Sequence, residues 1–225
     1  MRHLAGRAPL LLLFTIAIAA RAGAQEPPPP IGPFVVDVHA SLPGFPTDST
    51  QLANSRGLCA SPDDCGTALA SLPGRGWGAL VGAHFYFAHW KAVTFGVGGE
   101  VMVARATSTP PEGSTGLIPM EERLVTAAPQ LSLNFGSGHG WSYLNGGVGR
   151  SVWALHETGL EPSAADVEPL ETVNYGGGAR WFIKKHLAFS LDVRIYEIAA
   201  GTPIDPLQGS PRTRLLIVSA GVSLK

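Results

Sequence analysis

Ionisable side chains in this sequence lie in the middle of segments whose residues otherwise alternate between apolar and small polar types. The candidate interior cluster comprises three acids, three strong bases and two histidines, in chain order Asp37, His39, His84, Glu100, Arg180, Lys184, Asp192 and Arg194. Unpaired charges in a closed interior are costly, so equal numbers of acids and strong bases favour ion pairs that fill and lock it. The alternative use of the same residues is a polar filter for small solutes.

Residue types suited to covalent catalysis occur together at one place. His39 and Ser41 are two residues apart on one face of a segment, and a nucleophilic serine needs such a histidine, oriented by a carboxylate. That face is the predicted interior, so we interpret both as packed polar residues and expect no enzyme activity. We also expect no cofactor and no metal, because Gly176-Gly177-Gly178 precedes no helix and no His/Cys cluster occurs in the sequence.

The N-terminal residues have the order of a secretory signal peptide. A basic stretch precedes an apolar run, and the small residues Ala22-Gly23-Ala24 follow, as a signal peptidase requires. The apolar run is shorter than the span of about 20 residues that a membrane helix needs, which disfavours an uncleaved anchor. We predict a signal peptide over 1–24 cleaved near Ala24, an extended and mobile Pro-rich lead-in over 25–32, and one domain over 33–225.

The cysteines of the chain, Cys59 and Cys65, lie close together in the sequence. An exported chain meets an oxidising compartment, where a nearby pair usually closes a disulfide. We therefore predict a disulfide between them, worth about 2 kcal/mol on the loop-entropy argument. It would staple the long segment 43–75, and a stapled loop suits recognition and adhesion as well as simple resistance to proteolysis.

A period of two residues dominates the rest of the chain. Within 187–195, for example, Leu191 and Val193 share one face while Asp192 and Arg194 share the other. Segments of this kind predict eight β-strands, over 34–42, 76–88, 92–107, 123–136, 141–156, 170–184, 187–198 and 212–224.

The connections between these segments alternate strictly between long and short. Membrane barrels have short turns at one end and longer loops at the other, whereas a sandwich has no reason to sort its loops by length. The polar face is rich in Gly and Ser, which suits the crowded interior of a small barrel. We therefore predict an all-β fold, a closed antiparallel up-and-down transmembrane β-barrel of about eight strands. A soluble periplasmic β-sandwich that binds a ligand is the alternative.

Two further patterns concern the outer face of this barrel. Simple alternation places Arg150 on the lipid face, where a charge is costly. Because glycines precede it, we predict a β-bulge that turns Arg150 inward and sends Trp153 and Leu155 outward.

Aromatic residues fall near the strand ends at the short turns, as in the interfacial girdles of membrane barrels: Phe34, Phe87, Trp90, Phe95, Phe135, Trp141, Trp181 and Phe189.

Taken in order, the signal peptide, the amphipathic strands and the alternating loops resemble the small outer-membrane β-barrels of Gram-negative bacteria, of the OmpA/OmpX/OmpW-like type with a porin-like barrel domain. The segments 174–182 and 187–194 look like paired strands of that domain. The resemblance covers 33–225. It implies a place in the cell outer membrane, contact with outer-membrane lipid and lipopolysaccharide, insertion by the barrel-assembly machinery, and a monomer. The chain departs from the pattern at Lys225, where this class usually ends on an aromatic residue.

The composition excludes some classes of function but does not identify one. The net charge of −1 suggests no nucleic-acid partner, and after the signal peptide no apolar run is long enough for a membrane helix. A barrel of eight strands has an interior just wide enough for side chains. We predict a structural or surface role for a largely plugged barrel, with ligand or host contact through its outer loops. A narrow channel for small solutes is the alternative function.

Overall fold

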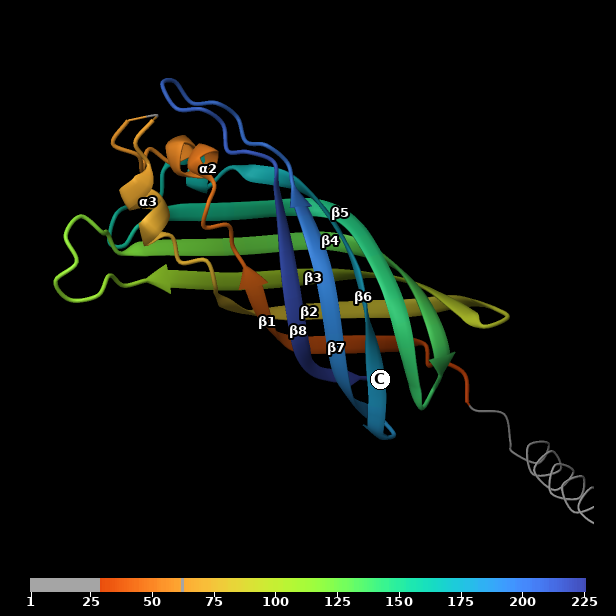
Figure 1. Ribbon diagram of the computed structural model, residues 1–225. Helices are drawn as coiled ribbons and strands as arrows, with labels where there is room; N and C mark the ends of the chain where they lie inside the picture. Colours follow the sequence, from red (N-terminus) through yellow and green to blue (C-terminus); the bar gives the residue numbers. More distant parts are fainter. Residues whose placement is uncertain (1–28, 62) are drawn as a thin grey trace, which may run out of the picture.

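The computed structural model describes residues 29–61 and 63–225, and within them eight strands form one closed antiparallel barrel. Each strand pairs with its neighbours in the sequence, and β1 pairs with β8 to close the ladder (Figure 1). This up-and-down order confirms the predicted fold and excludes the two-sheet sandwich. The predicted signal peptide, its cleavage near Ala24 and the first part of the Pro-rich lead-in lie outside the described residues.

The strands follow the period-two segments closely. Their bounds are β1 (Phe34–Gly44), β2 (Trp77–Trp90), β3 (Val93–Ser108), β4 (Met120–Ser137), β5 (Gly140–Glu157), β6 (Pro169–Lys184), β7 (Leu187–Ile198) and β8 (Thr213–Leu224). Each predicted strand is confirmed, with ends that differ by a few residues. The helical segments are short: α2 (Thr50–Ser55), α3 (Gly66–Ser71) and the 3-10 helix η1 (Ala164–Asp166). Within the described parts of the chain, no helix is long and apolar enough to cross a membrane.

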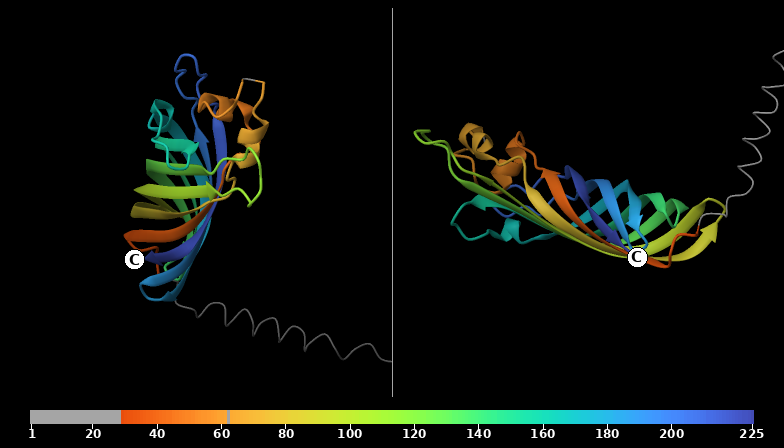
Figure 2. Two further views of the ribbon diagram at one scale, coloured as in Figure 1. Left: turned by 90° about the vertical axis from the view of Figure 1, so that its left-hand side faces the viewer. Right: turned by 90° about the horizontal axis from the view of Figure 1, so that it is seen from below.

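The two ends of the barrel differ in the length of their connections. The tight connections 91–92, 138–139 and 185–186 lie at one end, which we call the turn end. The long connections 45–76, 109–119, 158–168 and 199–212 lie at the opposite end, the loop end. There α2 and α3 cover the barrel, while the C-terminus lies at the turn end (Figure 1, Figure 2). This sorting confirms the predicted alternation of loop length.

The outward side chains of the strands form an apolar surface around the barrel. Large exposed apolar residues occur on every strand, for example Val38, Val81, Val101, Leu131, Leu144, Val173, Val193 and Val218. Exposed aromatic rings extend this surface at the turn end, as predicted: Phe34, Phe87, Trp90, Trp181 and Phe189. An apolar face of this extent requires an apolar environment. The prediction was wrong for Trp141, which faces inward and stacks on Phe182 with ring centroids 5.0 Å apart.

Arg150 corrects a second prediction about the outer face. The register between β4 and β5 is the same on both sides of the Gly-rich stretch, so no extra residue is inserted there. Arg150 therefore points outward, while Trp153 and Leu155 point inward and are buried. The guanidinium donates to the backbone oxygen of Pro169 at 3.2 Å, and Glu171 is its register partner on β6. These neighbours let the side chain stay outside without a bulge.

The inward side chains of the described strands stack in three layers along the barrel axis. The loop-end layer is apolar and includes Leu80, Met102, Leu124, Leu155 and Leu215. The middle layer carries charged side chains. The turn-end layer is aromatic, with Val35, Tyr86, Trp141 and Tyr143 packed against Ile31 and Phe182. The period-two pattern predicts a polar interior, but in the loop half an apolar cluster lies beside buried polar residues such as Glu122 and Thr126. Phe45 and Leu52 of the first loop pack against this cluster.

The described end of the Pro-rich lead-in is held against the turn end rather than mobile. The Gly138 backbone N–H donates to the Pro29 carbonyl at 2.6 Å, and the Tyr86 N–H donates to the Pro33 carbonyl at 2.8 Å. Between them, Ile31 packs against the turn-end layer. The lead-in therefore crosses the barrel at this end.

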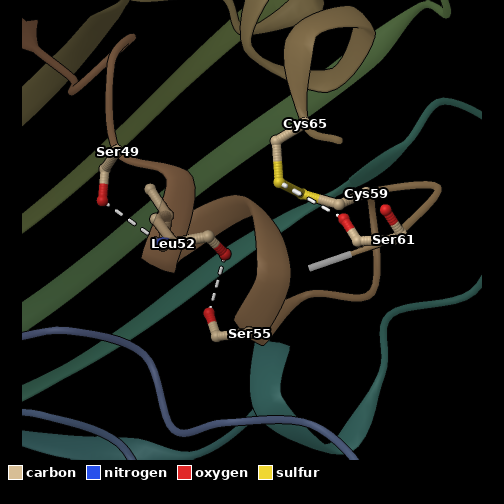
Figure 3. Close-up of a disulfide and its surroundings, with 6 residues drawn as sticks. All are labelled: Ser49, Leu52, Ser55, Cys59, Ser61 and Cys65. Atoms are coloured by element: carbon tan, nitrogen blue, oxygen red, sulfur yellow. Dashed lines mark hydrogen bonds between the residues drawn. A yellow bond between two sulfur atoms is a disulfide. The ribbon is translucent and has the colours of Figure 1, made fainter. Parts of the chain in front are cut away.

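The first loop, 45–76, is anchored at the loop end by α2. Its helix begins after Ser49, whose hydroxyl accepts a hydrogen bond from the Leu52 N–H at 3.2 Å, as an N-cap does (Figure 3). Leu52 is 0% exposed and packs into the loop-end layer. The predicted disulfide between Cys59 and Cys65 is confirmed, with Cα atoms 4.5 Å apart, directly before α3. The disulfide therefore shapes the part of the loop between α2 and α3.

Replacement of Leu52 by Ala tests this anchoring. We expect Leu52→Ala to lower the free energy of unfolding by about 2–5 kcal/mol, because it removes buried apolar contacts and leaves a cavity. The measurement is chemical unfolding of the refolded barrel in detergent micelles. The matched control is Leu160→Ala, at a loop position that is 60% exposed, which should change stability by less than about 0.5 kcal/mol. Equal losses in the two variants would contradict the anchoring.

Candidate functional site in the barrel interior

The middle layer of the interior contains an ion pair between Asp37 and Arg180. The Arg180 guanidinium donates from Nε to Asp37 Oδ1 at 3.0 Å and from Nη2 to Asp37 Oδ2 at 2.6 Å. Because β1 and β6 are not neighbours in the ladder, this two-point pair crosses the lumen. The Ser223 hydroxyl on β8 donates to Oδ1 at 2.5 Å. Bidentate pairs of this kind are strong and fix geometry.

A second group of charges surrounds Arg194 on β7. Its Nε donates to Asp192 Oδ1 at 2.8 Å, and its Nη1 donates to the Glu100 carboxylate on β3. Each carboxylate accepts a further hydrogen bond: the Tyr196 hydroxyl donates to Glu100 at 3.0 Å, and the Tyr143 hydroxyl donates to Asp192 at 2.8 Å. This network joins β3, β5 and β7, so it also crosses the lumen. We call the two groups together the charged layer.

Two histidines lie beside the Asp37–Arg180 pair. His84 Nδ1 is 3.9 Å from Asp37 Oδ2, and His39 Nε2 is 4.0 Å from Asp37 Oδ1. The charged layer holds three carboxylates, those of Asp37, Glu100 and Asp192, against two guanidinium groups. Both imidazole rings are buried beside this layer.

The closest approach to a nucleophilic arrangement is between His39 and Ser190. His39 Nε2 is 2.7 Å from the Ser190 hydroxyl, but Asp37 approaches the same ring nitrogen. A hydrolytic triad needs the carboxylate at the other nitrogen, where it orients the ring. Ser41, the predicted candidate, pairs instead with the Ser219 hydroxyl at 2.8 Å. Across residues 29–61 and 63–225, no group of three or more His, Cys, Asp or Glu side chains is arranged to hold a metal ion.

Lys184 corrects the predicted membership of the cluster. The other seven predicted residues are buried in the charged layer, whereas Lys184 is exposed at the turn end. The register between β6 and β7 shifts between Phe182 and Lys184. The rule that every second residue of β6 points inward therefore no longer holds after Phe182. The sequence interpretation missed Tyr143 and Tyr196, although both have the parity of inward residues on their strands.

Glycines on the inward face of β6 make room for the long side chains of the charged layer. A Cβ atom at Gly176 would lie 2.8 Å from the Arg194 side chain, and one at Gly178 would lie 2.5 Å from the Tyr143 hydroxyl. The Cβ at Gly178 would also collide with the carbonyl oxygen of Leu191. The Gly-rich inner face is therefore the counterpart of the bulky charged and phenolic groups on neighbouring strands.

Replacement of one of these glycines tests the packing. We expect Gly178→Ala to lower the free energy of unfolding by about 1–3 kcal/mol, because the added methyl group overpacks the layer and displaces Tyr143 from Asp192. Chemical unfolding in detergent micelles measures the loss. Gly99→Ala is the matched control, since its Cβ would meet nothing closer than the Ala128 carbonyl at 3.7 Å. A Gly178→Ala variant as stable as Gly99→Ala would show that the layer tolerates the volume.

A second buried polar group lies at the loop end. Arg56, from the first loop, donates from Nη2 to the Trp153 carbonyl at 2.8 Å, and its Nε is 3.6 Å from Asp166 Oδ1. The Trp153 indole N–H donates to the buried Glu122 carboxylate at 2.8 Å. Asp166 in turn accepts from the Leu155 backbone N–H at 2.8 Å. These contacts hold the first loop against β5 and η1. The alternation of side chains along strands could not predict this role of Arg56, because Arg56 lies in a loop.

Comparison with known proteins concerns the fold. No protein-family model matches the sequence, and no curated protein matches it. Among solved structures, Neisserial surface protein A (NspA) aligns with a TM-score of 0.51 and 13% identity, over 85% of this chain and 96% of that one. The attachment invasion locus protein Ail of Yersinia pestis, in complex with the heparin analogue sucrose octasulfate, aligns with a TM-score of 0.52 and 10% identity. That alignment covers 86% of this chain and 98% of Ail.

The closed barrel with short turns at one end and long loops at the other is thus the fold of the small outer-membrane barrels. The likeness to NspA and Ail confirms the predicted resemblance at the level of the fold. At 10–13% identity it says nothing of ligands or partners.

Proposed function

We propose that the chain is an outer-membrane barrel with a plugged interior, which serves as a rigid support for a surface at its loop end. The proposal is carried by the charged layer, in which Arg180 and Arg194 are 2% and 3% exposed and meet their carboxylates across the lumen. An apolar layer lies on the loop side and an aromatic layer on the turn side. A passing ion would have to part these pairs and lose its hydration in the apolar layer.

The proposed membrane placement rests on the outer face. Its apolar band, with aromatic rings at the turn end, suits lipid. We extend the proposal to export with cleavage of 1–24 near Ala24, insertion by the barrel-assembly machinery, a monomeric state, and contact with outer-membrane lipid and lipopolysaccharide. For lipopolysaccharide, a pocket at the loop end lined by Arg75, Trp77 and Arg105 supports the proposal, because it combines cations with an exposed aromatic ring.

The loop-end surface supports a contact role as a second part of the proposal. Its first loop is stapled by the disulfide and fastened through Leu52 and Arg56, so it offers a preorganised surface. Exposed acids on the described loops outnumber exposed bases: Asp48, Asp63, Asp64, Glu112, Glu161 and Asp205 stand against Arg75 and Arg212. This balance favours neutral or basic ligands over polyanions at the loops, whereas the cations of the pocket at Arg75 and Arg105 lie at the strand ends, where lipopolysaccharide would contact the barrel. The polyanion complex of Ail is therefore not carried over to this chain.

Conductance in planar lipid bilayers tests the plugged interior. We expect no steady ion current through the wild-type barrel, because the charged layer and the apolar layer both close the lumen. Arg194→Ala should also fail to conduct, since the loop-end layer stays in place. The matched control is Arg123→Ala, an exposed arginine at the loop end. Current steps in the wild type that change in Arg194→Ala but not in Arg123→Ala would replace the plugged barrel by the narrow channel.

The membrane placement has its own test. We expect the protein to fractionate with the outer membrane and to migrate differently on a gel before and after boiling, because a closed barrel resists unfolding by detergent until it is heated. A soluble extract without detergent, combined with identical mobility of boiled and unboiled samples, would contradict the placement.

A further inference from the structure

The ionisable side chains at the turn end are all of one kind. Among the described residues, every exposed or partly exposed ionisable side chain at this end is a lysine or a histidine: His89, Lys91, His139, Lys184, Lys185, His186 and Lys225. Acidic residues in the nearest parts of the strands, Asp37 and Asp192, are buried in the charged layer and paired. The loop end, by contrast, carries mostly acids. Within residues 29–61 and 63–225, the exposed ionisable side chains of the turn end thus form a ring of lysines and histidines that contains no carboxylate side chain.

A pocket of about 750 Å³ opens within this ring. It lies between the end of the lead-in, the turn 138–139 and the turn between β6 and β7. Its walls include the exposed apolar side chains of Phe34 and Ile183, and its rim includes Lys184, Lys185 and His186. One wall is therefore suited to a hydrocarbon chain and the adjoining rim to a negative charge.

The shape of the pocket follows from a local irregularity of β6. The register shift between Phe182 and Lys184 leaves Ile183 70% exposed on the outer face, and it brings Lys184 to the rim instead of the lumen. The departure of Lys184 from the predicted cluster thus has a structural consequence, because it adds a cation where the apolar band ends.

Backbone contacts hold the opposite side of the pocket in place. The Gly138 N–H donates to the Pro29 carbonyl, and the Lys225 ammonium donates to the Gly138 carbonyl. The Lys225 backbone N–H donates to the His186 carbonyl at 3.2 Å, and the His186 ring contacts the Lys225 carbonyl at 2.9 Å. The Lys225 ammonium also lies 3.8 Å from the Phe182 ring centroid. Lys225 therefore closes the floor, and Lys184 and Lys185 remain available for a ligand.

We propose that this pocket binds an anionic phospholipid of the leaflet at the turn end. The phosphate lies at Lys184 and Lys185, and an acyl chain lies along Phe34 and Ile183. The pocket suits such a lipid in two ways. Clustered lysines at a membrane surface attract anionic headgroups, and the apolar wall of the pocket is continuous with the lipid-facing surface of the barrel, where acyl chains lie. Lipopolysaccharide, at the loop end in the proposed orientation, would not reach it. The inference rests on the membrane placement proposed above.

Native mass spectrometry of the barrel purified from outer membranes tests the inference. Titration with phosphatidylglycerol is compared with phosphatidylcholine of the same acyl chains. We expect one phosphatidylglycerol to bind with clear preference, and Lys184→Gln/Lys185→Gln to weaken that binding about 30-fold, since each lysine near a lipid surface contributes about a fivefold factor in affinity. Lys91→Gln is the matched control, a lysine at the same end but outside the pocket, and should leave the affinity unchanged.

Other outcomes would overturn the assignment in distinguishable ways. Equal binding of the two lipids would exclude recognition of the anionic headgroup. A loss in Lys91→Gln as large as in the double variant would attribute the binding to overall charge instead of the pocket. Glycerol phosphate that binds as tightly as the lipid would remove the role of the apolar wall. Each variant is first checked for heat-modifiable migration, so that a failed membrane placement is detected separately from a failed lipid site.

Discussion

Pairing of charges across a closed lumen is the constraint on which the rest of this structure depends. Asp37 and Arg180 meet from strands that are not neighbours, and Arg194 joins carboxylates from two strands. A buried charge that lost its partner would be strongly destabilising, so the strands must keep one register for all pairs to form together. The small residues of the inner face follow from the same constraint, because Gly176 and Gly178 leave the space that Arg194 and Tyr143 occupy.

The loop end shows how a barrel with a charged middle can be closed by hydrophobic packing. Above the charged layer the lumen contains leucines, methionines and Trp153, which water would otherwise reach. Leu52 of α2 and Phe45 cover them, and Arg56 ties the same loop to the wall. The first loop is therefore part of the core, and its surface inherits the rigidity of the barrel. This coupling explains how a disulfide of small span can shape the surface of the loop end.

Period-two alternation was enough to predict the strands, the sorting of loops and most of the charged layer, because side-chain direction in a strand follows from position alone. It failed where parity is interrupted or where a loop intervenes. Lys184 lies beyond a register shift, and Arg56 enters the barrel from a loop. Arg150 shows the opposite error, since a bulge was expected where the ladder is regular. An outward arginine is tolerated there because the Pro169 carbonyl accepts its hydrogen bond.

The contrast between interior and turn end completes the electrostatic argument. Inside the barrel, the carboxylates and guanidinium groups of the charged layer pair with each other, and the carboxylates also accept hydrogen bonds from phenolic and hydroxyl donors. At the turn end, lysines such as Lys185 face outward with no carboxylate beside them among the described residues. The charges of the interior are thus buried and mostly paired, whereas lysines of the turn end are exposed where the apolar outer surface ends. Recognition by charge is therefore expected outside the lumen, at the rim where lipid headgroups lie.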